Sequence, residues 1–368
     1  MLVLWADPSA ENLGLQALAG GVQAVAERSW GPCDVTFHSH NTPDTPLRRK
    51  LALQDVGRRS GPVVRYIRQF DVVMDTGGGD SFTDIYGVQR LLLMAYIQRA
   101  CRKAQVPLVM TPQTIGPFRT YVGRAVASRL LSEVDVLCTR DPVSSRAATS
   151  FGRRPSLLAT DMAFALPRPT PVKQRDVVLN VSGLLLQSNP HVDSTRERSY
   201  ICRSNGAPAC RRQESHLASR MCWIPPVPDN DVPAVYAAAE AVSGKVEIVI
   251  PEGLEEVRKL LSGCRVLVGS RMHSVINALS VGVPAISWSY SRKFGPLMDD
   301  LGWQHTFDLT SSVDPVPATL DLISASSLEF LTDAAPGVAS TAEAKIEEMI
   351  EVLVSNDIFA AFGNRRSI

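Results

Sequence analysis

Apolar residues follow two patterns along the chain. Short continuous runs alternate with longer segments in which apolar residues recur every three or four positions. The runs predict buried strands, and the longer segments predict helices with one apolar face. In the first half, the predicted strands are residues 2–5, 35–37, 72–75, 108–111 and 136–138. Strands that alternate with helices in this way form parallel sheets with helices on both faces.

The alternation stops at the proline-rich stretch 167–171 and then begins again. Further strands are predicted at 177–181, 247–250, 266–268 and 285–288, and a closing helix over 341–354. The predicted fold class is α/β, with two Rossmann-like, doubly wound domains that face a cleft. The predicted boundaries are 1–168 for the first domain, 169–335 for the second and 336–368 for a C-terminal helical tail.

One segment, residues 195–228, breaks the pattern. Its apolar period is lost, Arg, Ser and Pro dominate, and three of the seven cysteines cluster in it. A Rossmann half requires a helix and a strand at this place. Two interpretations remain open, a long insertion or a pair of compensating frameshifts. Translation of the other reading frames distinguishes them, because a frameshift requires an amphipathic helix and an apolar strand in one of those frames.

The stretch 264–289 carries the strongest functional signal. The apolar run 266–268 ends at Gly269, and Ser270 stands where a helix N-cap is expected. A strand, a tight turn and a helix start place Arg271 and His273 at the carboxyl edge of a parallel sheet, where such folds bind ligands. The helix N-terminus and the guanidinium both favour an anion. The sequence therefore predicts a phosphate or carboxylate site here.

Other predicted strand ends carry weaker candidates. Three glycines follow the strand 72–75, and glycine lets a backbone approach a ligand closely. Arg140 follows the strand 136–138 and has two readings, a ligand contact or a salt bridge at the strand end. A loop lysine such as Lys293 is a phosphate contact or a solvated side chain. The remaining binding candidates at strand ends are Gly78, Gly79, Asp80, Gln113 and Ser291.

Composition narrows the class of protein. The 368 residues are 45% hydrophobic and 20% charged, which excludes a disordered or fibrous chain. A net charge of +1 argues against nucleic acid as a partner. The local basic cluster at residues 48–59 has two interpretations, a solvated loop or a docking patch for acidic lipid or glycan.

Cysteine and histidine usage indicates the compartment and the absence of a metal. The seven cysteines form no CxxC pair, so a reducing cytoplasm is favoured over a disulfide framework. The histidines have no metal-ligand spacing, so no metal is expected. The N-terminus lacks a basic region, and no apolar run approaches the roughly 20 residues of a membrane helix. We therefore expect a soluble cytoplasmic protein.

Four motifs together resemble the polysaccharide pyruvyl transferase family. They are DVVMDTGGGDSFTDIYG (71–87), PLVMTPQTIGPF (107–118), DVLCTRDPVS (135–144) and the stretch from 264 to 303 with its Arg-Met-His motif. Two features depart from the family pattern. The N-terminal turn Asn-x-Gly-Asp reads Asn12, Leu13, Gly14, Leu15 here, and the segment 195–228 replaces a strand with a Pro-His pair.

The resemblance implies a GT-B-like enzyme that transfers pyruvate from phosphoenolpyruvate to two sugar hydroxyls as a cyclic ketal. It implies no cofactor, an acceptor side in the first domain that includes Asn12, and a donor site in the second. Arg271 and Arg140 are then expected to hold the two anionic groups of the donor, and His273 to transfer protons. The expected acceptor is a sugar or glycan, free or lipid-linked, which allows peripheral association with the inner face of a membrane.

Two other functions remain open. A GT-B glycosyltransferase with a nucleotide-sugar donor would use the same architecture and the same anion site. A non-catalytic glycan-binding relative is favoured by the missing N-terminal carboxylate and disfavoured by the intact Arg271 and His273.

Overall fold

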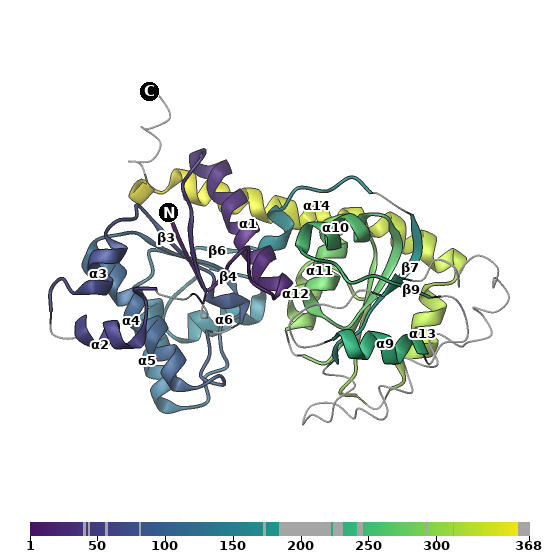
Figure 1. Ribbon diagram of the computed structural model, residues 1–368, viewed down its shortest axis with the longest axis horizontal. Helices are drawn as coiled ribbons and strands as arrows, with labels where there is room; N and C mark the ends of the chain where they lie inside the picture. The colour runs from purple at the N-terminus through teal and green to yellow at the C-terminus, as the bar shows by residue number, and fades with distance from the viewer. Residues whose placement is uncertain are drawn as a thin grey trace. The chain divides into compact units, whose positions relative to one another are not determined.

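The computed structural model describes residues 1–39, 42, 45–55, 58–80, 82–171, 174–183, 222–223, 231–240, 246–291, 293–311 and 313–359. The chain divides into two compact units, each with its own parallel sheet. The first unit comprises Met1–Ala10, Gly14–Leu166 and Glu343–Ile368, and the second comprises Glu11–Leu13 and Pro167–Ala342. Figure 1 shows the helices and strands of both units.

The sheet of the first unit has six parallel strands in the order β2-β1-β3-β4-β5-β6. Their bounds are β1 Leu2–Leu4, β2 Thr36–His38, β3 Val73–Asp75, β4 Leu108–Gln113, β5 Val136–Thr139 and β6 Leu157–Leu158. The order of the strands reverses between β1 and β3, because β2 lies on one side of β1 and all later strands lie on the other. Open α/β sheets bind ligands beyond the carboxyl ends of the strands at such a switch point.

Helices cover both faces of this first sheet. They are α1 Leu13–Trp30, α2 Arg49–Asp55, α3 Pro62–Ile67, α4 Val88–Ala104, α5 Tyr121–Leu131 and α6 Pro142–Ser150. One core joins Ile67, Met94 and Leu130 of α3, α4 and α5 to the strands. The end of α14 packs beside α1 in this unit, where Arg28 pairs with Glu347. Phe359 of the short helix η5 Asp357–Phe359, which follows α14, has its ring centroid 5.1 Å from that of Trp30. Figure 1 shows α1 and this end of α14 away from α2 to α5.

The sheet of the second unit also has six parallel strands, in the order β12-β11-β10-β7-β8-β9. Their bounds are β7 Arg175–Asn180, β8 Cys222–Trp223, β9 Glu247–Ile248, β10 Cys264–Gly269, β11 Ala285–Ser289 and β12 Thr306–Asp308. The switch point lies between β7 and β10. The predicted α/β class with two Rossmann-like sheets is confirmed.

The second unit corrects part of the expectation for residues 195–228. Cys222–Trp223, near the end of this segment, forms β8 and pairs with both β7 and β9. The strand that a Rossmann half requires is therefore present, although it is too short for its apolar pattern to be recognised. The other residues of 195–228 lie outside the described part of the chain.

The helices of the second unit are α9 Val232–Glu240, α10 Leu254–Ser262, α11 Met272–Ser280, α12 Phe294–Asp300, α13 Pro315–Leu322 and the start of α14 Ala325–Ser355. The closing helix begins well before the expected residue 341 and continues through Pro336. Apolar side chains such as Leu331, Ala335, Ala339 and Ala342 are fully buried on one face, so packing outweighs the helix-breaking tendency of proline. Among the described helices, none is long and apolar enough to cross a membrane.

Candidate functional site

The predicted anion site lies at the switch point of the second sheet, where β7 and β10 end side by side. Asn180, the last residue of β7, joins the two strand ends. Its backbone oxygen accepts from the Ser270 amide at 3.1 Å, and its Oδ1 accepts from the Arg271 amide at 3.2 Å and from Ser274 Oγ at 2.7 Å. Asn180 therefore fixes the turn from which α11 begins.

Ser270 is not the N-cap that the sequence predicts. Arg271 occupies that position with an extended backbone and makes no side-chain cap, and α11 begins at Met272. The Ser270 hydroxyl donates to the Asn180 backbone oxygen at 3.1 Å and accepts from the Ser182 amide at 2.8 Å. The buried hydroxyl is directed towards β7, because the backbone amide of Ser182 in the loop after that strand needs a hydrogen-bond acceptor. Ser270 thus shapes the turn.

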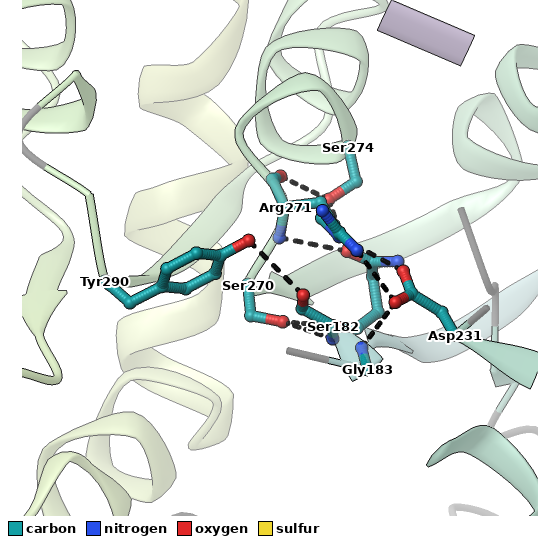
Figure 2. Close-up of polar contacts among 8 residues, drawn as sticks. Ser182, Gly183, Asp231, Ser270, Arg271, Ser274 and Tyr290 are labelled. Carbon is teal, nitrogen blue, oxygen red and sulfur yellow. Dashed lines mark hydrogen bonds and ion pairs between the residues drawn. The ribbon is translucent and has the colours of Figure 1, made fainter. Parts of the chain in front are cut away.

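The Arg271 guanidinium forms a two-point ion pair with Asp231, just before α9. Nε donates to Oδ2 at 3.1 Å and Nη2 donates to Oδ1 at 2.8 Å. Asp231 is fully buried and also accepts the amide of Gly183. Figure 2 shows Arg271, Asp231 and Gly183 together. One edge of the predicted fork, formed by Nε and Nη2, is therefore directed to an internal carboxylate.

His273 lies in the first turn of α11 and is partly buried. Its backbone oxygen accepts from Asn277 Nδ2 at 2.6 Å, and Asn277 Oδ1 accepts from Arg258 Nη1 at 2.8 Å. Arg258, on α10, also donates to Ser280 Oγ at 2.7 Å and to the Pro167 oxygen at 3.2 Å. Burial, followed by the nearby positive charge of Arg168, lowers the pKa of Arg258 to about 10. A buried arginine thus braces the helix that carries Arg271 and His273.

The loop after β11 lies at the same edge of the second sheet. The Tyr290 hydroxyl is 3.3 Å from Ser182 Oγ, as Figure 2 shows. Ser289 Oγ donates to the Ser291 backbone oxygen at 3.0 Å, and Lys293 directly precedes α12. Burial lowers the pKa of Lys293 to about 8, so its ammonium is in a poorly solvated environment. Ser291 and Lys293 are therefore on the predicted loop, with Lys293 partly buried.

In the first unit, the glycine turn lies at the switch point between β1 and β3. Gly78 and Gly79 have φ values of 60° and 80°, which favour glycine, and the Gly78 amide donates to Thr76 Oγ1 at 3.1 Å. Asp80 accepts from the Tyr86 hydroxyl at 2.8 Å. Asn12 lies immediately before α1, apart from these residues in sequence.

Gln113, a binding candidate from the sequence, is fully buried beneath this turn. Its Nε2 donates to the Asp75 backbone oxygen at 3.3 Å. A Cβ at Gly77 would lie 1.4 Å from Gln113 Oε1, which explains the glycine there. Burial raises the pKa of the neighbouring Asp75 side chain to about 6, although Gln98 and the Gly77 amide donate to it. Gln113 therefore supports the turn from inside.

Arg140 is also fully buried, which differs from the expectation that it reaches a donor. Nη1 is 3.1 Å from Asp161 Oδ2, and Nη2 donates to Thr114 Oγ1. Asp161 Oδ1 accepts from the Ala163 amide at 3.0 Å and caps the short helix η2 Met162–Ala165. The salt bridge considered as the alternative for Arg140 is thus the one present.

Sequence reasoning missed four residues whose hydrogen bonds hold the candidate site together. Asn180 is a polar residue that ends an apolar strand, and this signal is visible in the sequence. Asp231 lies 40 positions from Arg271, and Arg258 and Asn277 lie within helical patterns. No spacing rule connects these last three to Arg271 or His273. In the described part of the chain, no group of three or more His, Cys, Asp or Glu residues is placed to hold a metal ion.

Comparisons with known proteins give the fold and the family. The UDP-GlcNAc 2-epimerase of Neisseria meningitidis is similar in structure, with a TM-score of 0.58, 11% identity and coverage of 96% of this chain and 99% of that one. HepE of Anabaena has a TM-score of 0.54 at 13% identity, with coverage of 96% and 99%. At these identities the likeness shows a GT-B-like fold alone.

Relatives found by sequence identify the family, which the structural neighbours do not. The amylovoran biosynthesis protein AmsJ of Erwinia amylovora is 23% identical over 260 residues, which are 64% of this chain and 60% of that protein's length. The family model described as polysaccharide pyruvyl transferase matches residues 20–292, a range that includes the glycine turn, Arg271 and His273. The chain therefore belongs to the polysaccharide pyruvyl transferase family.

Proposed function

We propose that this transferase moves pyruvate from phosphoenolpyruvate to two hydroxyls of a sugar, as a cyclic ketal, during exopolysaccharide biosynthesis. The observation that carries the proposal is the placement of Arg271 at the N-cap and His273 in the first turn of α11, at the switch point of a sheet. A helix N-terminus and a guanidinium suit a donor with a carboxylate and a phosphate. The name of AmsJ, an amylovoran biosynthesis protein, supports the pathway class.

The proposed reaction assigns a task to each group. Protonation of the donor methylene carbon makes the adjacent carbon electrophilic, and the first sugar hydroxyl adds there. Phosphate leaves, the second hydroxyl adds, and the two hydroxyl protons end on the new methyl group and on phosphate. His273 transfers these protons, Arg271 holds one anionic group and Lys293 holds the other. The ion pair with Asp231 fixes the orientation of the Arg271 guanidinium.

Replacement of Arg271 by lysine tests the donor site. We expect the dissociation constant for phosphoenolpyruvate to rise about ten-fold or more, because an ammonium cannot reproduce the planar two-point contact or the pairing with Asp231. Calorimetric titration measures it. Arg265→Lys is the matched control, since Arg265 is an exposed residue of the same strand β10. Equal donor affinity in Arg271→Lys and wild type would exclude this assignment.

Lys293 makes donor binding depend on pH. Its pKa of about 8 means that the ammonium is lost as pH rises through 8, and binding of an anion favours the protonated form. Affinity for phosphoenolpyruvate is therefore expected to fall by up to about ten-fold per pH unit above 8. Titrations across this range with Lys293→Met, and with the exposed Lys259→Met as control, check the effect. A slope unchanged in Lys293→Met would assign the titration to another group.

The acceptor side is proposed for the first unit, with Gly78, Gly79 and Asp80 at its switch point. Asn12, just before α1, belongs to the second unit and is not part of this proposed side. The proposed acceptor is a sugar or glycan, free or lipid-linked, and the proposed location is the cytoplasm or the inner face of a membrane. A glycosyltransferase with a nucleotide-sugar donor is the second candidate, because HepE, which shares the fold, binds UDP and glucose. Release of nucleoside diphosphate in place of phosphate distinguishes it.

A further inference from the structure

Positive charge is concentrated in one part of the chain. Residues 48–154 contain 18 Lys or Arg and 8 Asp or Glu, a net charge of +10, whereas the whole chain has a net charge of +1. This range includes α2 to α6 of the first unit. The asymmetry creates a positive field on one unit and favours an anionic partner there.

Within this basic range, the N-terminal ends of α4 and α5 lie together. The Asp84 carboxylate joins them, since it accepts from the amide of Arg119 at 2.8 Å, from the amide of Thr120 at 2.7 Å and from Thr120 Oγ1 at 2.6 Å. Residues on either side of these contacts are therefore neighbours on the surface, although they are about 35 positions apart in sequence.

The two residues that follow Asp84, and the two that follow Thr120, have apolar or aromatic side chains and are exposed. Tyr121 is 88% exposed, Val122 50%, Tyr86 47% and Ile85 40%. We call these four residues the Tyr121 patch. Exposed apolar groups that lie together on a soluble surface are typical of an interaction site.

Three arginines lie near residues of the Tyr121 patch, and the acidic Asp80 accepts from the Tyr86 hydroxyl. Arg119 and Arg124 are exposed beside Tyr121 on α5 and the residues before it. The Arg90 guanidinium lies 5.6 Å from the centre of the Tyr86 ring, so this cation is held against the patch. A surface that mixes tyrosine, aliphatic side chains and arginine matches the headgroup region of a bilayer, where aromatic rings and cations both find partners.

We propose that the Tyr121 patch docks the first unit on an anionic membrane surface. Arg119 and Arg124 attract the negative headgroups, and Tyr121 and Val122 enter the interface. The aliphatic side chains decide between partners, because phosphates of a nucleic acid or of a soluble polyanion give Ile85 and Val122 nothing to contact. The inference deepens the proposed location at the inner face of a membrane, on which it rests, and vesicle binding tests it separately from the proposed reaction.

Co-sedimentation with vesicles tests the proposal. The probes are vesicles of equal parts phosphatidylglycerol and phosphatidylcholine, and vesicles of phosphatidylcholine alone. We expect the wild type to prefer the anionic vesicles. Arg119→Gln and Arg124→Gln should each lower binding about five-fold at low salt. Tyr121→Ser combined with Val122→Ser should also lower binding, and the binding that persists at high salt should be lost with these two residues.

Two control variants show whether a loss of vesicle binding is specific to the Tyr121 patch or follows from the removal of any exposed arginine or aromatic side chain. Arg154→Gln removes an exposed arginine of the same unit outside the patch, and Phe330→Ser removes a side chain that is 69% exposed on α14. Both should bind like the wild type, and all variants should melt within a narrow range because the changed side chains are exposed. Equal binding to neutral vesicles, or patch variants that bind like the controls, would overturn the proposal. Competition with single-stranded RNA tests a purely electrostatic surface. If RNA displaces the protein from vesicles, and if Tyr121→Ser leaves vesicle binding unchanged, the proposal is also overturned.

Discussion

Replacement of His273 by asparagine is expected to lower turnover about 10²- to 10⁴-fold, the usual contribution of a general acid–base group. Asparagine keeps a hydrogen-bonding side chain on the first turn of α11 but transfers no proton near neutral pH. The helix should remain in place, because Asn277 contacts the backbone oxygen of His273 and not its ring. Turnover with phosphoenolpyruvate and calorimetric binding of the same donor, measured in parallel, check the prediction.

The parallel binding measurement gives each outcome a distinct meaning. Retained donor binding with lost turnover supports proton transfer by His273. Loss of both would make His273 a donor ligand or a structural residue, and unchanged turnover would remove it from the mechanism. His305→Asn is the control, because His305 belongs to the same unit and its ring packs against Trp303. It should keep turnover within a small factor of the wild type.

Removal of the buried cation in the first unit is expected to cause the largest loss of stability. Arg140→Met leaves the fully buried Asp161 carboxylate without its positive partner, which typically costs about 3–5 kcal/mol. For a protein of this size the melting temperature should fall by about 10 °C. Thermal unfolding followed by circular dichroism measures the change. Arg146→Met is the control on the same helix α6, where the side chain is exposed.

The paired replacement makes this test specific. Arg140→Met combined with Asp161→Leu removes both charges, and an apolar pair in place of a buried ion pair is often neutral. We therefore expect the double variant to recover much of the lost stability, less the cap that Asp161 provides to Ala163. A stable Arg140→Met protein that fails to bind phosphoenolpyruvate would contradict the structural role and return Arg140 to the donor site.

The fold was largely predictable from sequence because its strands are continuous apolar runs buried on both faces. Strands such as β3 and β10 appear within a residue or two of their expected bounds. Asp141, directly before Pro142, caps α6, with its side chain accepting from the Ser144 amide at 2.8 Å. β8 was missed because a strand of two residues shows no repeating pattern. The start of α14 was missed because the shared apolar face was recognised only from residue 341 onwards.

The candidate site was predictable only in part. Strand ends and helix starts are local features, so Arg271 and His273 were placed at the correct edge of the second sheet. The direction of a side chain depends on partners that are remote in sequence. Asp231 turns the Arg271 fork inwards, and Asp161, 21 positions away, holds Arg140 in the interior. Local pattern contains no information about such pairs.

The donor is the central claim, and phosphorus NMR tests it most directly. The purified protein is incubated with phosphoenolpyruvate, UDP-glucose and a mixture of sugar acceptors, and the phosphorus signals are followed with time. The account predicts that phosphoenolpyruvate is converted to inorganic phosphate only when acceptor is present, that UDP-glucose persists, and that His273→Asn abolishes the conversion. Release of UDP from UDP-glucose while phosphoenolpyruvate remains unchanged would contradict it.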